Sequence, residues 1–273
     1  MNTNIVKAMI RKDLRDIFRT KSLLATIIVI PVLFSVLLPG ILLGSAVFFD
    51  VEKTLGNDMG KLLETFLSQT NGILFDNAEQ QMVYIFVNYL LPSFFLLVPI
   101  ITASVVASNS FVGEKERRTL ESLLFSPIPV RTLFISKTLA SFIPSFLVSV
   151  LSFILCGFVI NLLGYQLFGE MIFPTANWLV LITCLSPMVT LLTVLLNIFI
   201  SARVKTFQEA QNIGGLIILP VIAMIAGQAG GLFIVGPLVM FLLSAAVLAF
   251  NLILLQRITK MNDRHVLFEK QIH

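Results

Sequence analysis

The stretch SFVGEKERRTLESLLFSPIPVRTLFISK, residues 110–137, concentrates five basic and three acidic side chains between two long uncharged runs. Across the whole chain, 57% of residues are hydrophobic and only 12% are charged, whereas soluble proteins carry about 25% charged residues. The mean hydropathy is +0.95. A block this charged must lie in water, while the runs beside it are typical of membrane spans. The sequence therefore predicts an all-α polytopic membrane protein.

Stretches without Lys, Arg, Asp or Glu mark the expected spans. They cover residues 22–49, 80–113, 138–169, 171–202 and 210–256. A helix needs about 20 residues to cross the ~30 Å hydrocarbon core, so each of the first four runs crosses once. The fifth crosses twice, with a turn at the clustered glycines of 227–231. We expect one transmembrane domain over 22–255, with six spans at about 22–48, 83–108, 137–163, 177–201, 212–227 and 232–255.

The positions of the cations indicate the orientation. If the N-terminus is cytoplasmic, 17 of the 19 Lys and Arg residues lie on the inner side, as the positive-inside rule requires. This places the loop 109–136 and the tail 256–273 in the cytoplasm and the loop 49–82 outside. The net charge of +4 then follows from topology, and we expect no nucleic-acid partner.

Residues 1–21 change to a helical period. Lys7, Arg11, Arg15 and Arg19 step by four along one side, and apolar residues recur on the other. This pattern predicts an amphipathic connecting helix at the cytoplasmic membrane surface. It can act as an anchor beside anionic headgroups or as a lever between a cytoplasmic partner and the first span. A cleaved signal peptide is not expected, because the first apolar run has 28 residues and signal cores have roughly 7–15.

The charged block also has helical spacing. One face carries Glu114, Arg117, Arg118 and Glu121, and another carries Leu120, Leu123 and Leu124. Thr119 can cap a new short helix that Pro127 ends about two turns later. We therefore expect the second span to continue past the membrane surface, break near Arg118, and lead into a short amphipathic helix.

The string GEKERRTLESLLFSPI, residues 113–128, followed by Lys137, resembles the signature of the ABC-2 type permeases, the membrane subunits of ATP-binding cassette exporters. The positions that match are Glu114, Glu116, Thr119, Leu120, Glu121, Leu123, Leu124 and Pro127. Arg118 departs from the pattern, because many members have glycine before the Thr-Leu-Glu step. A glycine would ease the helix break, whereas Arg118, with Arg117 beside it, can add a cationic contact to a partner. Among its members, the chain is most similar to bacterial sodium, drug or peptide exporters of the sodium-exporter permease type.

The resemblance implies an ABC-2 (type V exporter-like) fold in the bacterial plasma membrane. Its loop 109–136 would hold a cytoplasmic coupling helix that docks on a separate ATPase subunit. Two ATPase copies and a second permease subunit, identical or related, would complete the exporter. ATP and Mg would bind to the ATPase, and no cofactor is expected on this chain. The only string near a phosphate-binding loop, GNDMGKL at 56–62, has the wrong spacing and no hydroxyl after the lysine.

The spans indicate little about cargo. As bounded above, they are expected to lack an internal charge or histidine, which disfavours a proton relay or a buried ion site. Asn88, Asn161, Asn197 and Gln228 are candidate polar residues of the pathway, or contacts between helices. The 24 phenylalanines favour an apolar or amphipathic substrate, such as a drug, lipid or peptide, over sodium. Every span contains proline, which membrane helices tolerate at kinks.

Two other classes of function stay open. A membrane scaffold that recruits an ATPase without transport would keep the same coupling helix. An intramembrane enzyme would need an activated nucleophile, paired carboxylates or a metal site. The two histidines, His265 and His273, lie in the tail, and the two cysteines lie in separate spans. We therefore expect no catalytic residue and no metal site.

Overall fold

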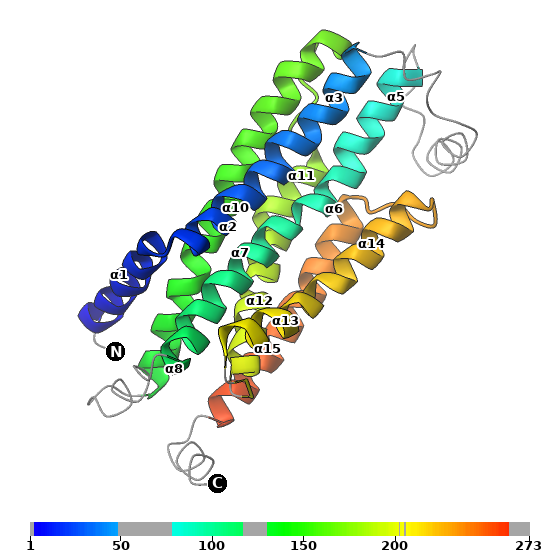
Figure 1. Ribbon diagram of the computed structural model, residues 1–273. Coiled ribbons are helices and arrows are strands. Elements are labelled where there is room, and N and C mark those ends of the chain that lie inside the picture. The colour runs from blue at the N-terminus through cyan, green and yellow to red at the C-terminus, as the bar shows by residue number, and fades with distance from the viewer. Residues whose placement is uncertain (1–2, 49–77, 117–129, 202, 205, 262–273) are drawn as a thin grey trace.

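The computed structural model describes residues 3–48, 78–116, 130–201, 203–204 and 206–261. These residues form helices joined by short turns, with no strand in the described ranges. Six of the helical segments are long and apolar enough to cross a membrane (Figure 1). They cover Leu23–Ser45, Gln80–Glu116, Thr132–Phe168, Ala176–Ser201, Phe207–Ala229 and Pro237–Ile258. The prediction of an all-α polytopic protein with six spans is confirmed.

The amphipathic helix α1 (Thr3–Arg19) precedes the first span. The first three spans are built from the following elements: α2 (Lys21–Val32), η1 (Leu33–Leu37) and α3 (Leu38–Phe48); α5 (Ala78–Ile85), η3 (Phe86–Leu90), α6 (Leu91–Phe95), α7 (Leu97–Ser108), η4 (Asn109–Gly113) and α8 (Glu114–Glu116); and α10 (Val130–Phe168). The last three are built from α11 (Ala176–Val180), η5 (Leu181–Leu185) and α12 (Ser186–Ser201); α13 (Phe207–Gly214), η6 (Gly215–Ile218) and α14 (Leu219–Ala229); and α15 (Pro237–Met261).

Span 2 lies at the centre of the bundle. Figure 1 shows α5, α6 and α7 between α3 and α10 on one side and α14 and α15 on the other. Its apolar side chains are buried on several faces, including Val87, Leu91 and Phe95 in the outer half and Ala103 and Ala107 in the inner half. A helix that is apolar all round is expected in such a central position.

The helices of spans 2 and 3 extend beyond the uncharged runs. The helix α10 has 39 residues, which corresponds to about 58 Å, well beyond the ~30 Å hydrocarbon core. At the other end of the predicted loop 109–136, residues Asn109–Glu116 continue span 2 as η4 and α8. Charge marks where a helix leaves the hydrocarbon, but backbone hydrogen bonds continue the helix into water. The helical ends of this loop therefore belong to the spans.

Prolines coincide with wide π-helical turns in three spans. The segments η1, η3 and η5 each end two residues before a proline, at Pro39, Pro92 and Pro187. A proline lacks the N–H group and its ring clashes with the carbonyl four residues earlier. That carbonyl falls within the π segment in each case, so the wider turn makes room for the ring and leaves backbone acceptors for other partners.

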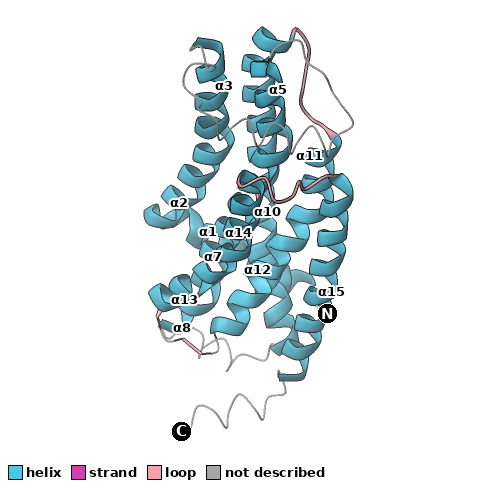
Figure 2. Cartoon of the chain, turned by 90° about the vertical axis from the view of Figure 1, so that its right-hand side faces the viewer, coloured by secondary structure: helices cyan, strands magenta, loops and turns pink. Residues whose placement is uncertain are grey.

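The loop 169–175 between spans 3 and 4 folds back against the bundle. Figure 2 shows it descending from the end of α10 to α11. Asn161 of α10 holds it, donating to the Phe173 carbonyl at 2.9 Å and accepting from its N–H at 3.1 Å. The Phe173 ring covers Gly157 so closely that a Cβ atom at this glycine would lie 2.3 Å from Cε1 of the ring. Phe173 also meets Trp178 edge-on at 5.0 Å between centroids, so the loop completes the outer aromatic core.

Candidate functional site around Glu114

The helix α1 packs against α10 (Figure 1). Its apolar side faces the bundle, and Ile17 is only 5% exposed. Its cations Lys7, Arg11, Arg15 and Arg19 lie on the exposed side. The amphipathic pattern in the sequence therefore corresponds to a helix with one packed side and one cationic side.

Glu114 connects α1 to two spans. It opens α8 directly after the π-helical turn η4 of span 2, and the residue is 8% exposed. Its Oε1 atom lies 2.5 Å from Nζ of Lys12 on α1, and its Oε2 atom lies 2.5 Å from Nζ of Lys137 on α10. One carboxylate thus bridges two ammonium groups from different helices.

Lys137 is fully enclosed at this junction, with 1% of its surface exposed. Besides Glu114, its ammonium group donates to the Ser110 carbonyl at 2.5 Å and lies 5.4 Å from the centroid of the Phe111 ring. The expectation that the spans lack internal charge is therefore wrong at this point. The apolar run begins at 138, but α10 begins at Val130, so Lys137 sits two turns inside the helix rather than at its mouth.

Lys115 and Glu116, the next two residues of the motif, contact the connection between α12 and α13. Lys115 donates to the Val204 carbonyl at 2.9 Å and to the Ser201 carbonyl at 3.4 Å. Glu116 accepts from the N–H of Phe207 at 3.1 Å. The cation thus lies at the carbonyl end of α12 and the carboxylate at the N–H end of α13, which is the favourable pairing with each helix dipole.

The motif segment Glu114–Glu116 therefore forms a junction of charged contacts with α1, α10, α12 and α13. The sequence indicated Glu114 and Glu116 as contacts to an ATPase, but both carboxylates are bonded within the chain. Lys12 was missed as a partner of Glu114, because one charge cannot be matched to another 102 residues away without a fold. Lys137 was noted beside the motif, but its pairing with Glu114 was not predicted. The other predicted coupling residues, namely Arg117, Arg118, Thr119, Leu120, Glu121, Leu123, Leu124 and Pro127, lie outside the described residues.

Two of the four candidate pathway residues tie span 2 to its neighbours. Asn197 of α12 accepts from Ser108 of α7 at 2.9 Å. Gln228 of α14 accepts from Ser93 of α6 at 2.5 Å. Both amides therefore bridge helices within the bundle.

Asn88, in the π-helical turn η3, has partners on the loop 169–175 and on span 4. Its side-chain oxygen accepts from Thr175 at 2.8 Å, and its carbonyl accepts from Asn177 at 2.8 Å. Trp178 donates to the neighbouring Val87 carbonyl at 3.0 Å. Asn161 holds the loop at Phe173, as described above. All four amides thus have intramolecular partners, and their role in a pathway stays a prediction.

The described ranges contain no group of three or more His, Cys, Asp or Glu side chains that could hold a metal ion. At the junction around Glu114, charged side chains of α1, α8 and α10 pair with one another instead. Such an arrangement organises helices around an inner connection. It defines the class of protein as a polytopic helical membrane protein whose charged segment Glu114–Glu116 is bonded to its own helices.

The family can now be stated. The model of a family described as "ABC-2 family transporter protein" matches residues 7–237, so the chain belongs to this family. The match runs from α1 to the start of α15 and includes the whole charged motif. No curated protein and no solved structure matches the chain. The chain is thus a membrane permease component of an ABC transporter and not itself the catalytic subunit, while the sodium-exporter subtype stays a prediction.

Proposed function

We propose that this chain is the permease subunit of an ATP-binding cassette exporter. It forms the translocation pathway with a second permease copy or a related permease, in a bacterial plasma membrane with both termini in the cytoplasm. Two separate ATPase subunits bind ATP and Mg and dock on the coupling loop 109–136. The observation that carries this proposal is the family match over residues 7–237, which includes the coupling motif.

The junction at Glu114 supports the coupling part of the proposal. The chain enters the loop through α8, whose three charged side chains are each bonded to a different part of the bundle. The chain leaves the loop into α10. Lys137 on this helix pairs with the same Glu114 carboxylate. A force applied to the loop by a docked ATPase therefore acts on spans 2 and 3 and on α1 together.

The proposed substrate is apolar or amphipathic, such as a drug, a lipid or a peptide, with sodium as the less favoured cargo. Among the described residues, the outer and middle thirds of the six spans carry amides and hydroxyls but no carboxylate. A transported cation would call for carboxylates or a cluster of oxygen ligands in that region. The polar groups there suit weak contacts with an uncharged or amphipathic molecule.

The test is purification of the tagged full-length chain from its native cells in mild detergent. Co-purifying proteins are identified by mass spectrometry, and the ATPase activity of the preparation is measured. We expect a P-loop ATPase at similar abundance, lost in E121A and in L123A/L124A but retained in S126A, a control within the string at a position that is not among the matching residues. If no ATPase is recovered in any of several detergents, the coupling assignment is refuted. If an ATPase binds but reconstituted vesicles move none of the substrate classes, the scaffold function takes its place.

A further inference from the structure

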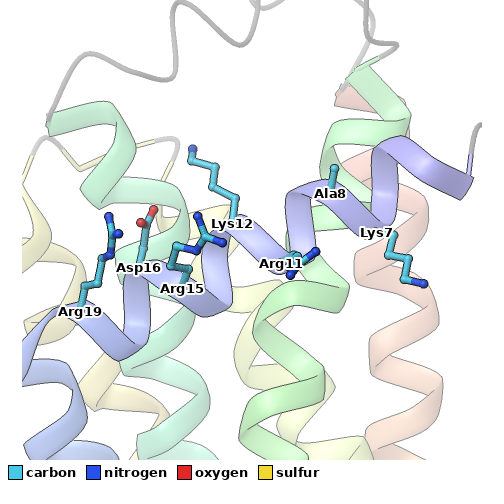
Figure 3. A pocket seen from close by; sticks show the side chains of 7 residues that line it. All are labelled: Lys7, Ala8, Arg11, Lys12, Arg15, Asp16 and Arg19. Atoms are coloured by element: carbon cyan, nitrogen blue, oxygen red, sulfur yellow. The ribbon is translucent and has the colours of Figure 1, made fainter.

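The exposed side of α1 carries a row of cations that neither the fold nor the coupling junction uses. Lys7, Arg11, Arg15 and Arg19 follow one another at intervals of four residues, which spreads four charges over about 18 Å of helix. A shallow depression of about 550 Å³ runs along this side (Figure 3). Its described lining consists of Lys7, Ala8, Arg11, Lys12, Arg15, Asp16 and Arg19.

The charge of this row is not neutralised by described carboxylates. No ion pair joins Lys7, Arg11, Arg15 or Arg19 to a carboxylate among the side chains that the structure describes. Lys12 differs, because it bonds to Glu114. The described lining of the depression holds five cations against the single carboxylate of Asp16. A molecule that binds there must therefore be anionic.

The position of α1 identifies the source of the anion. The opposite side of the helix is packed on α10, and the membrane-spanning part of span 1 begins at Leu23. Arg19 is thus four residues from the start of that span, with the extended Thr20 between the two helices. Roughly 6–13 Å of chain separates them, which is comparable with the ~8–10 Å over which charges act at physiological salt. A row of cations on an interfacial helix matches the plane of phospholipid headgroups. An acidic protein would have to compete with those headgroups for the same surface.

We propose that this side of α1 is a binding surface for anionic phospholipids of the cytoplasmic leaflet. The phosphodiester oxygens accept from the guanidinium groups of Arg11, Arg15 and Arg19, which suit bidentate contacts with phosphate. Lys7 adds a fourth charge at the far end of the row. Lys12 follows Arg11 on the same helix and pairs with Glu114. A lipid that fixes the position of α1 therefore also fixes the position of Lys12 at the coupling junction.

The experiment is a lipid titration of the purified full-length chain in mild detergent, with bound lipids counted by native mass spectrometry. The probes are dioleoylphosphatidylglycerol and dioleoylphosphatidylcholine, which share acyl chains and differ in headgroup charge. The wild-type chain should prefer the anionic lipid. Each cation near a membrane surface contributes roughly a fivefold change in affinity, so R15Q alone should weaken binding of the anionic lipid by about fivefold.

The matched variants remove four charges each. The quadruple variant K7Q/R11Q/R15Q/R19Q should bind both lipids equally, whereas R257Q/K260Q/R264Q/K270Q, with the same number of cations removed from the C-terminal segment, should keep the preference. The charge-preserving R11K/R15K/R19K should keep most of it.

The proposal is overturned if the quadruple α1 variant keeps the preference or if the C-terminal variant loses it equally. It is also overturned if the charge-preserving variant loses the preference as fully as the quadruple one. If the quadruple variant keeps its lipid preference but no longer retains an acidic protein from the native cells, the surface belongs to that protein. The titration uses the permease alone, so its outcome is independent of whether an ATPase docks or transport occurs.

Discussion

Replacing Glu114 should be the most destabilising single change at the junction that it forms with Lys12 and Lys137. E114Q keeps the shape of the side chain but removes the charge that Lys137 faces at 2.5 Å. Lys137 is 1% exposed, so water cannot take over. Breaking a buried ion pair in this way costs about 3–5 kcal/mol, because the remaining charge is left buried and uncompensated.

Replacing either of the other two residues of the junction, Lys12 or Lys137, should lower stability less. The side chain of Lys12 is 47% exposed, and a pair of this exposure contributes only about 0–1 kcal/mol, so K12Q should have a small effect. K137M removes the buried cation itself and leaves Glu114 with Lys12. The double variant E114Q/K137M should therefore be more stable than E114Q alone, which is the non-additivity expected of two groups in contact.

The assay is thermal unfolding of the full-length chain in detergent, read as the fraction that stays monodisperse in gel filtration after heating. A change of 1 kcal/mol shifts Tm by about 2–4 °C for a chain of this size class, so E114Q should lower Tm by roughly 6–20 °C and K12Q by less than about 4 °C. Equal shifts for E114Q and K12Q would refute the role of the buried Lys137. A double variant whose loss equals the sum of the two single losses would refute the direct pairing.

The same assay tests three other positions. G157A should lower stability by about 1–3 kcal/mol, because its Cβ would lie 2.3 Å from the ring of Phe173, whereas G44A should be neutral because nothing lies within 4 Å of that position; equal shifts would contradict the close packing of the loop. W178F should cost about 1–3 kcal/mol, since the buried carbonyl that accepts from the indole at 3.0 Å is left unpaired; an unchanged Tm would show that this bond contributes nothing. E116Q should cost only about 0.3–1 kcal/mol, the usual value for a carboxylate at a helix N-terminus, and a shift larger than that of W178F would contradict this assignment.

The six spans and the amphipathic helix were accessible from the sequence because each depends on a local pattern. Uncharged runs reveal where a helix meets hydrocarbon, and the four-residue steps from Lys7 to Arg19 reveal which side of α1 faces water. The junction was not accessible in this way. Lys137 and Glu114 mark the edges of uncharged runs, so they were read as exposed ends, whereas the longer helices place them opposite each other at 2.5 Å.

The π-helical turns show a second limit of local patterns. Pro39, Pro92 and Pro187 each follow such a turn, but Pro144 lies inside α10 without interrupting it. A proline therefore permits a distortion without dictating its form. In η3, the side chains of Asn177 and Trp178 on the neighbouring span donate to the carbonyls that the wider turn leaves free. That partnership depends on packing between spans, which the sequence of one helix does not contain.

The outer aromatic core has a practical consequence. Trp178 is the single tryptophan of the chain, and it is 0% exposed, enclosed by Phe95, Phe153 and Phe173. The intrinsic fluorescence of the isolated permease therefore reports from one place, the contact of spans 2, 3 and 4 beneath the loop 169–175. A rearrangement that admits water to this place shifts the emission to longer wavelength, whereas a movement confined to the Glu114 junction leaves it unchanged. The wild-type chain thus carries its own optical probe for telling outer opening from inner opening.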